Sequence, residues 1–404
     1  MAVGKTPYAL SGVFRVSLYF SGVEFPFTKE SFIGILHMSE SSKLEIPMMR
    51  LQLTDGVKFF KNNPSLLVEG CQLGIAVLAR EVQTGLYVFR VNSLKITPDQ
   101  TGDVIDIDGY LDFPKFWIQT TNASYPKITS NDLLNQIATN AGLTYDGDVT
   151  SDQQTWHGGA KRLHAFCNEI ANHGYSSDTS CMKLAVCLDG TMRYKDVSKL
   201  DVADPVAKLI IGDIKQGYLT VVSFLPKNAG GTTNRKAGYR QTAAEYSAVR
   251  GSVYRVHTNM AADINEGGEF NMSQDVRAQV TSGSHTCFAI DYGNVHDNYN
   301  RAQYQNKRGT ALFNVGLDVL VNMPSIEKPR VITVFDTVNV TAPSDMSELN
   351  GSWIVVSHAI AITNSQYHEK FELTRRTAAS DQSKKASDDV KFESTSTNLY
   401  TDKD

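Results

Sequence analysis

Three aspartates that share one face of a predicted strand are candidates for carboxylate chemistry. Residues 104–112 alternate between apolar and polar side chains, and Asp106, Asp108 and Asp112 fall on the polar face. Such a cluster could bind calcium or serve glycoside hydrolysis. Side chains on one face of a strand lie roughly 7 Å apart, whereas a calcium loop needs a tight turn with glycine. The spacing therefore favours a solvated face.

Histidines and cysteines gather in the middle of the chain, where they could bind zinc. The side chains of the right type are His157, His164, His173, Cys167, Cys181 and Cys187. No Cys-x-x-Cys or His-x-x-x-His pair fixes two ligands within one turn. Cys167 falls on an apolar helix stripe and Cys187 in the apolar half of a hairpin, where cysteine usually packs as a small hydrophobic residue. The pattern favours core packing over a metal site.

The tripeptide Gly4-Lys5-Thr6 ends like a phosphate-binding loop. That loop needs a first glycine five residues before its second one, and no residue stands five positions before Gly4. We therefore predict no nucleotide site here.

A basic segment at residues 226–245 could contact a polyanion through Lys227, Arg235, Lys236 and Arg240. Only Tyr239 supplies an aromatic ring among them, which is not typical of a surface for single-stranded nucleic acid. We expect a solvated, mobile loop or a contact ordered by a partner. Together these motifs predict no catalytic residues, no cofactor, no metal and no enzyme activity.

The composition is that of an ordinary soluble protein with several domains. The chain has 404 residues, of which 41% are hydrophobic and 20% charged, a net charge of −4 and five cysteines. This excludes a general attraction to nucleic acid, a disulfide framework and a disordered chain. Because no apolar run reaches about 20 residues and the N-terminus lacks a secretory signal, we expect synthesis and assembly in the cytoplasm.

The first 120 residues read as an antiparallel barrel or sandwich. Short strands are predicted at residues 14–20, 66–77, 86–91 and 104–112, with Gly, Asn, Asp and Pro between them. The next 75 residues differ, because two helical stripes follow. One helix is capped by Ser130 or Asn131 and ends at Gly142, the other begins near Gly159 and ends at Gly174, and a hairpin then turns at Asp189-Gly190.

Strands return in the last part of the chain. They are predicted at residues 209–211, 218–225, 249–257, 311–323 and 331–340, with an irregular stretch at 226–300 and a polar helix at 296–308. A closing hairpin then runs from Trp353 to Thr374 with a turn at residues 363–366. The polar residues after Arg376 cannot form a core and should be mobile.

Two stretches resemble the baseplate hub proteins of contractile-tailed bacteriophages, which are related to the hub part of type VI secretion spike proteins. The closing hairpin carries the pattern through Gly351, Trp353, Val355, His358, Tyr367, Leu373 and Arg375. The middle module carries it through Leu133, Leu134, Ile137, Ala138, Gly142, Trp156, Leu163, Phe166, Ile170, His173-Gly174-Tyr175 and Asp189-Gly190.

The resemblance implies a mainly β fold with an α+β module: two tail-tube-like antiparallel β-barrels plus a small helix-helix-hairpin domain. The expected domains are a first barrel at 1–125, the module at 126–200 and a second barrel at 201–376. The second barrel contains a loop-rich insertion at about 226–300, and a flexible tail follows at 377–404. If one barrel face lines an axial channel, Asp106, Asp108 and Asp112 would repel passing DNA there.

The resemblance also implies a structural virion protein of the tail baseplate. A homotrimer would present six barrels and so adapt a six-fold tail tube to a three-fold central spike during tail assembly and genome delivery. Implied partners are the tail tube, spike and baseplate wedge proteins and the tape-measure protein, with DNA passing through the lumen without specific binding. The alternatives are a hub of a non-phage contractile injection system, a siphophage-type tail protein, or a tail-associated cell-wall hydrolase.

Overall fold

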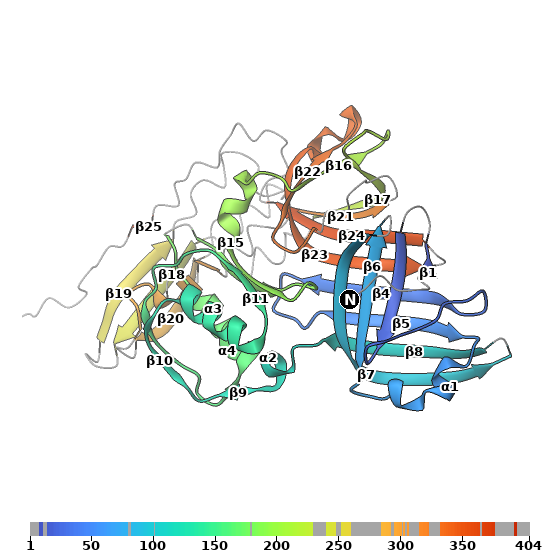
Figure 1. The fold of residues 1–404 in the computed structure, drawn as a ribbon. Helices are drawn as coiled ribbons and strands as arrows, with labels where there is room; N and C mark the ends of the chain where they lie inside the picture. The colour runs from blue at the N-terminus through green and yellow to red at the C-terminus, as the bar shows by residue number, and fades with distance from the viewer. Residues whose placement is uncertain are drawn as a thin grey trace, which may run out of the picture.

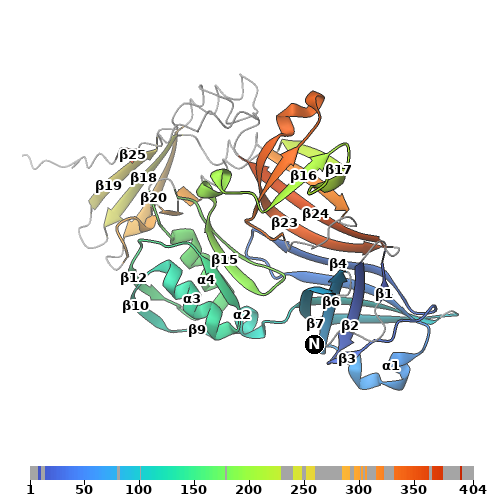
Figure 2. The ribbon, with the colours of Figure 1, turned by 45° about the horizontal axis from the view of Figure 1, so that its top comes forward.

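The chain is mainly β, with a small α+β module between two β units, as predicted. The computed structural model describes residues 8–10, 14–79, 82–100, 102–177, 180–228, 240–247, 252–259, 284–291, 295–300, 302–303, 305–306, 315–322, 332–363, 366–375 and 392–393. No helix among these residues is long and apolar enough to cross a membrane. Figures 1 and 2 show the module beside the two β units, which lie edge to edge.

The first β unit is an antiparallel sheet ordered β1-β2-β6-β7-β8-β5-β4. Its strands are β1 (Tyr8–Ala9), β2 (Phe14–Phe20), β3 (Val23–Glu24), β4 (Phe32–Ser41), β5 (Met48–Asp55), β6 (Gln72–Ala79), β7 (Val82–Asp99) and β8 (Gly102–Leu111). The predicted alternation in residues 104–112 is confirmed, because Ile105 and Ile107 are buried and the aspartates point to the opposite face. The sequence pattern missed β4 and β5.

The first unit does not close into a ring of paired strands. Within the described residues, β4 pairs with none of β1, β2 and β3 at the other end of the sheet. Helix α1 (Phe59–Asn62) and a 3₁₀ helix at Pro64–Leu66 follow β5 in the chain. Phenylalanine rings join α1 to β2, and those that pack face to edge or stacked are Phe20, Phe25, Phe27, Phe59 and Phe60. Their apolar area stabilises this part of the unit.

The α+β module contains the two predicted helices and the predicted hairpin. Its elements are α2 (Pro114–Ile118), β9 (Thr120–Thr121), β10 (Ser124–Ile128), α3 (Ser130–Ala141), β11 (Thr144–Gly147), β12 (Gln154–His157), β13 (Lys161–Arg162), α4 (Leu163–His173), β14 (Met182–Val186) and β15 (Thr191–Asp196). The N-cap of α3 is Thr129, not Ser130 or Asn131, because the Thr129 hydroxyl accepts from the Asp132 N–H. Ser130 is buried instead and donates to Asp152.

The second β unit is a closed six-stranded barrel. It consists of β16 (Ala207–Ile211), β17 (Leu219–Asn228), β21 (Val315–Asn322), β22 (Thr337–Thr341), β23 (Gly351–Thr363) and β24 (Gln366–Arg375). The ring order is β23-β22-β16-β17-β21-β24, and β24 returns to β23. Most pairs are antiparallel as predicted, but β16 runs parallel to both β17 and β22. Two 3₁₀ helices, Val197–Val202 and Ser344–Leu349, flank the barrel strands in sequence.

The stretch interpreted as an irregular insertion contains a separate four-stranded sheet. Its strands are β18 (Arg240–Ser247), β19 (Ser252–Asn259), β20 (Ser284–Asp291) and β25 (Phe392–Glu393). Strand β25 comes from the segment predicted as a free tail and pairs with the end of β19. Positions 299–300, 302–303 and 305–306 are helical, within the predicted helix at 296–308. Weak alternation in a polar sequence hid these strands, because backbone pairing does not require apolar side chains.

Candidate functional site

The two β units join through one strand pair, which makes a wall of eight strands. Strand β4 of the first unit pairs antiparallel with the second half of β23, from Ser41 opposite Ser357 to Ile35 opposite Thr363. The wall runs β7-β8-β5-β4-β23-β24-β21-β17, with four strands from each unit (Figure 1). We call the β4–β23 pair the internal seam.

The two halves of the wall have the same topology. Across the wall, the first half runs β7, β8, β5, β4 and the second half runs β23, β24, β21, β17. In each half the strand that comes third in the chain is followed by the fourth, the second and the first. Strand β7 therefore corresponds to β23, and β4 corresponds to β17. The hairpins β7–β8 and β23–β24 each contain one bulge, at Asn92 and at Val356. When the two bulges are superposed, every pair of the first hairpin has a counterpart in the second, so that Val91 corresponds to Val355 and Ser93 to Ser357.

A second pair of bulges repeats in the other two strands. Gly34 bulges in β4 opposite β5, and Val222 bulges at the same place in β17 opposite β21. Since a bulge is a specific local device and not a random defect, two matching bulges indicate a true structural repeat. The wall therefore consists of two copies of one four-stranded motif, joined edge to edge through β4 and β23.

A buried charged cluster lies at the internal seam. Its centre is His358 on β23, which lies between Glu369 on β24 and Glu40 on β4. His358 Nε2 lies 3.2 Å from Glu369 Oε2, and Nδ1 lies 3.5 Å from Glu40 Oε1, a charge contact longer than a hydrogen bond. Tyr367 Oη donates to the other Glu369 oxygen at 2.6 Å. The cluster thus links one strand of the first unit to two strands of the second.

Opposing effects set the charge of His358. Its burial lowers the pKa, but the hydrogen bond to Glu369 and the charges of Glu369 and Glu40 outweigh burial and raise the pKa to about 10. The imidazole is therefore protonated at neutral pH. Burial and the neighbouring Glu369 charge also raise the pKa of Tyr367, so its hydroxyl remains a donor. A buried ion group of this kind is stable only while all its partners are present.

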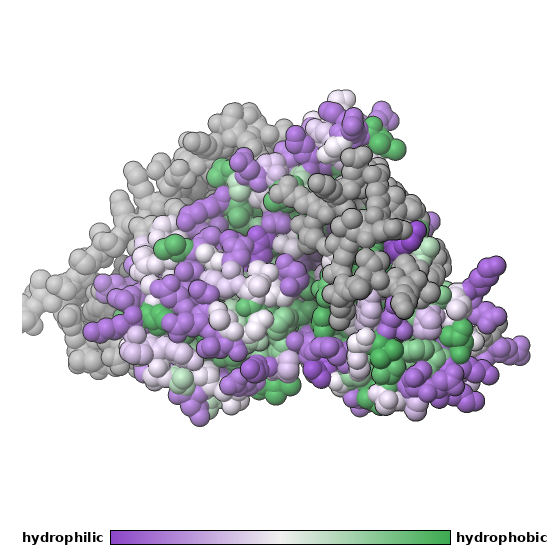
Figure 3. Space-filling view, in the orientation of Figure 1, coloured by the Kyte–Doolittle hydropathy of each residue, from purple (hydrophilic) through white to green (hydrophobic). Residues whose placement is uncertain are grey.

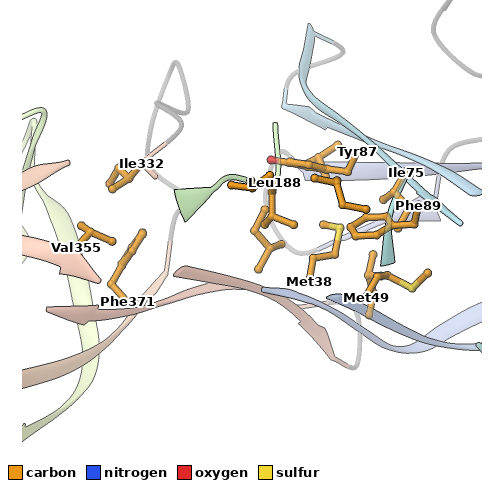
Figure 4. Close-up of a cluster of buried hydrophobic side chains, with 14 of the residues drawn as sticks. Met38, Met49, Ile75, Tyr87, Phe89, Leu188, Ile332, Val355 and Phe371 are labelled. Carbon is orange, nitrogen blue, oxygen red and sulfur yellow. The ribbon is translucent and has the colours of Figure 1, made fainter. Parts of the chain in front are cut away.

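The hairpin of the α+β module enters the same junction. The N–H groups of Leu188 and Val334 donate to the two Glu40 oxygens, and both residues are buried. Figure 4 shows Leu188 among core side chains of the first unit, beside Met38 and Tyr87. Glu40 therefore accepts hydrogen bonds from the module and from the segment that precedes β22, and it joins all three parts of the chain.

A second set of contacts holds the module to the barrel. Arg193 on β15 donates to the Val334 carbonyl and to Asp336, and its Nε lies 3.1 Å from Asp146 Oδ2. Burial lowers the Arg193 pKa, but Asp336 and Asp146 raise it overall, so the guanidinium stays charged. Because both ends of the β14–β15 hairpin are bound, the module is fixed relative to the wall.

The three predicted aspartates lie on the polar face of the wall, each with a different partner. Asp106 accepts from Gln52, Asp108 from Ser93, and Asp112 from Arg90, whose Nε lies 2.7 Å from it. Each carboxylate is thus used in a cross-strand contact of its own, with Asp108 exposed and the Asp112 side chain only 7% exposed.

The structure separates the histidines and cysteines of the predicted module. Cys167, Cys181 and Cys187 are buried, and burial raises the pKa of the Cys167 and Cys187 thiols. His173 stacks on Tyr299 with ring centres 3.7 Å apart, and His157 contacts Ser124. Among the described residues, no group of three or more His, Cys, Asp or Glu side chains is placed to hold a metal ion.

The basic segment and the Gly4-Lys5-Thr6 motif lie mostly outside the described residues. Lys227 is described, and its ammonium lies 2.6 Å from Asp318 Oδ2. The hydrogen bond to Asp318 raises the Lys227 pKa. This lysine therefore belongs to the wall and not to a loop.

Sequence reasoning missed the charged cluster, although one signal was present. Glu369 falls on the apolar side of its strand, together with Tyr367 and Phe371. A carboxylate at an inward position requires a buried partner. The partners Glu40 and His358 are more than 300 residues apart, so only the fold brings them together.

Protein-family models do not match the sequence, and neither do curated proteins. Solved structures do match. The chain has the fold of a tail protein from Neisseria meningitidis MC58, at 10% identity and a TM-score of 0.58 over 91% of this chain and 98% of that one. The 43 kDa tail protein of prophage MuSo2 from Shewanella oneidensis matches at 10% identity and a TM-score of 0.60, over 90% and 99%.

A prophage tail protein from Listeria monocytogenes EGD-e matches at 10% identity and a TM-score of 0.50, over 90% of this chain and 94% of that one. The fold of this chain is therefore the fold of phage tail proteins, which confirms the resemblance seen in the sequence at the level of structure.

Proposed function

We propose that this protein is a structural hub of a phage tail baseplate, whose chains form a trimeric ring between a six-fold tail tube and a three-fold spike. One observation carries the proposal: a single chain holds two copies of one four-stranded motif, joined edge to edge in one wall. A motif that occurs twice per chain lets three chains present six equivalent surfaces. This is the geometry that a six-fold to three-fold adapter needs.

We assign a different set of partner contacts to each of the three parts of the chain. The two β units, within residues 1–125 and 201–376, would contact the tube protein on one side and the spike on the other. The module at 126–200 lies beside the wall, the inserted sheet lies next to the module and away from the wall (Figure 2), and both would face wedge proteins. In the view of Figure 3, hydrophobic areas of the described surface are small and separated, which fits contacts made over many modest patches.

The polar face of the wall would line the central channel. The module hairpin packs on the other, apolar face, where Leu188 contacts the core. On the polar face, His37, Arg50, Asp108 and Lys370 are exposed, so both charge signs are present. Such a mixed surface would let DNA and a tape-measure protein pass without binding them tightly.

The alternatives differ mainly in context. A hub of a non-phage contractile injection system, or a siphophage-type tail protein, would use the same wall. A cell-wall hydrolase would need a cleft in which a catalytic acid or nucleophile lies beside a base. A groove of about 620 Å³ between the module and the wall is lined by both apolar and polar side chains, and Lys183 within it donates to the Asn306 carbonyl. Its lining includes Ser42 and His164, but among the described residues His164 Nδ1 has no hydrogen-bond partner and so does not act as a base on a neighbouring hydroxyl.

The proposal is tested by the mass of the protein in solution. Native mass spectrometry or light scattering should give three chains, alone or with the spike protein, and the trimer should bind a tube ring. Purified protein should release no fragments from peptidoglycan. A monomer that stays single in the presence of both neighbours would contradict the proposal, and so would turnover of peptidoglycan.

A further inference from the structure

Strand β14 of the module has one paired edge and one open edge. Within the described residues it pairs only with β15. Directly before β14, the Cys181 carbonyl accepts from the Val197 N–H. Directly after it, the Cys187 N–H donates to the Thr191 carbonyl. The odd-numbered residues of the strand therefore bond to β15, and the backbone groups of the even-numbered residues point to the open edge.

Side chains occupy the two ends of the open edge. At one end the Met182 N–H donates to Asn306 Oδ1 at 2.8 Å. At the other end the Leu188 N–H donates to the Glu40 carboxylate. Both donors have even numbers, which agrees with the direction assigned to the open edge. The ends are therefore closed by contacts within the chain, and only the residues between them are available to a partner.

The middle of the open edge has no partner among the described residues. It consists of Leu184 and Val186, whose N–H and C=O groups form no hydrogen bond with any described residue. The two residues are 4% and 0% exposed. Buried backbone groups in a folded protein are nearly always hydrogen-bonded, because an unpaired group costs free energy. An added strand would therefore complete the sheet at this short stretch.

The groove between the module and the wall opens onto this edge. Lys183 and Leu184 line it, together with side chains of α4, residues 42–45 and β23. Ala185 packs with Phe335 of the segment before β22, so the odd-numbered side chains face the barrel and Leu184 faces α4. A groove beside an open strand edge suits β-strand addition, in which backbone hydrogen bonds hold an extended peptide and pockets take alternate side chains.

We propose that this groove binds an extended acidic segment of a partner protein, which adds a strand to the open edge of β14. The charges of the lining favour this sign. Lys43 and Lys183 line the groove, and neither forms an ion pair within the described part of the chain. The lining also includes Glu45, whose carboxylate accepts from the Ser41 hydroxyl. Carboxylates on the partner would thus meet two ammonium groups that have no acidic partner.

The two faces of β14 specify the pattern of the bound segment. Side chains beside Leu184 would pack in the apolar part of the groove, next to Ala171 of α4. Side chains beside Lys183 would carry the carboxylates. A segment in which apolar and acidic residues alternate fits both faces. This interaction goes beyond the proposed trimeric ring, because the module does not belong to the motif that the wall repeats.

Peptide binding to the full chain tests the proposal. The probe is a short labelled peptide of alternating valine and glutamate, and fluorescence anisotropy measures its affinity. We expect saturable binding, and amide hydrogen exchange at Leu184 and Val186 should slow at least tenfold when the peptide is bound. A peptide of alternating valine and lysine should bind at least tenfold more weakly.

Backbone methylation separates strand addition from apolar contact alone. N-methylation of the valine amides blocks one edge of the peptide, and N-methylation of the glutamate amides blocks the other. One methylated peptide should lose binding and the other should keep it, because only one edge of the peptide bonds to β14. Equal affinities of the two methylated peptides would overturn the added strand.

Three variants check that the peptide lies in the groove. Ala165→Trp fills the groove from an exposed position on α4 and should abolish binding, while circular dichroism shows an unchanged fold. Lys183→Glu should weaken binding of the glutamate peptide at least tenfold and strengthen binding of the lysine peptide. The matched control Lys61→Glu makes the same charge change at an exposed position of α1, in the first unit, and should leave both affinities unchanged.

The remaining outcomes assign the groove differently. No saturable binding of the glutamate peptide, or unchanged binding to Ala165→Trp, overturns the site. A peptide with the sequence of residues 376–391 that binds more tightly than the probe assigns the groove to this chain itself. A lower oligomeric mass for Ala165→Trp than for the wild type assigns it to a second copy. Both results overturn the partner segment, and the proposed hub is tested separately by the mass of the wild type.

Discussion

The two β units share one motif and differ in how it is closed and what it buries. The second unit is a ring in which β16 connects β17 to β22 by parallel pairing. The first unit has no pairing between β4 and the opposite end of its sheet within the described residues, and phenylalanine rings join its strand β2 to α1. The same four strands thus occur once in a closed barrel and once in an open sheet, because their shared wall is specified by its own bulges and pairings.

The inward-facing side chains of the two hairpins differ at matching positions. Leu94 and Ile105 of the first hairpin correspond to His358 and Glu369 of the second. The charged version lies at the seam that is permanent within the chain, where Glu40 completes it. The apolar version lies at the edge that is open in a single chain. In this protein the buried ion cluster thus lies where all its partners belong to the same chain, which suits a cluster that is destabilised by the loss of any partner.

Removing the protonated imidazole of His358 should reduce the free energy of unfolding more than the other changes described below. His358→Leu copies the first hairpin but leaves Glu40 and Glu369 buried without it, so we expect a loss of about 3 to 5 kcal/mol in unfolding free energy. Urea denaturation measures it. The double variant His358→Leu/Glu369→Ile copies the first hairpin more fully and should lose less. If the double variant is the less stable of the two, the comparison between the hairpins is wrong.

A change of pH should have the next largest effect. The folded pKa of His358, about 10, is above the ordinary value of 6.5. Its contribution is therefore complete below about pH 6.5 and is lost as pH rises toward 10, at up to about 1.4 kcal/mol per pKa unit. Melting temperatures between pH 6.5 and 10 should fall more for the wild type than for the double variant. Parallel curves would show that His358 does not titrate in this range.

The smallest effect is expected at the polar face of the first unit. Arg90 and Asp112 form an ion pair in which the Arg90 side chain is 35% exposed and the Asp112 side chain 7%. Arg90→Ala should cost about 1 to 2 kcal/mol, because Asp112 loses two charged hydrogen bonds but keeps the one from Gln72. The same urea assay measures it. A loss as large as that of His358→Leu would mean that half-exposed and fully buried pairs contribute alike, against the argument made for the seam.

Local patterns predicted much of the fold. Alternation in residues 104–112 and 367–374 gave β8 and β24, and the apolar stripes gave α3 and α4. Gly142 and Gly190 have positive φ, as the predicted helix end and hairpin turn require. These features were readable because their cause lies within a few residues. The division into domains and the absence of a catalytic, cofactor or metal site stay predictions.

The sequence by itself determined the two helices of the module, the strands with clear alternation and the fold family that the closing hairpin resembles. Only the tertiary structure decided that β4 meets β23, that Glu40 meets His358, and that the two halves of the wall repeat each other. The reason is physical: the β7–β8 and β23–β24 hairpins share backbone geometry and bulges while their side chains differ. Pairing between strands more than 300 residues apart leaves no local pattern in either strand.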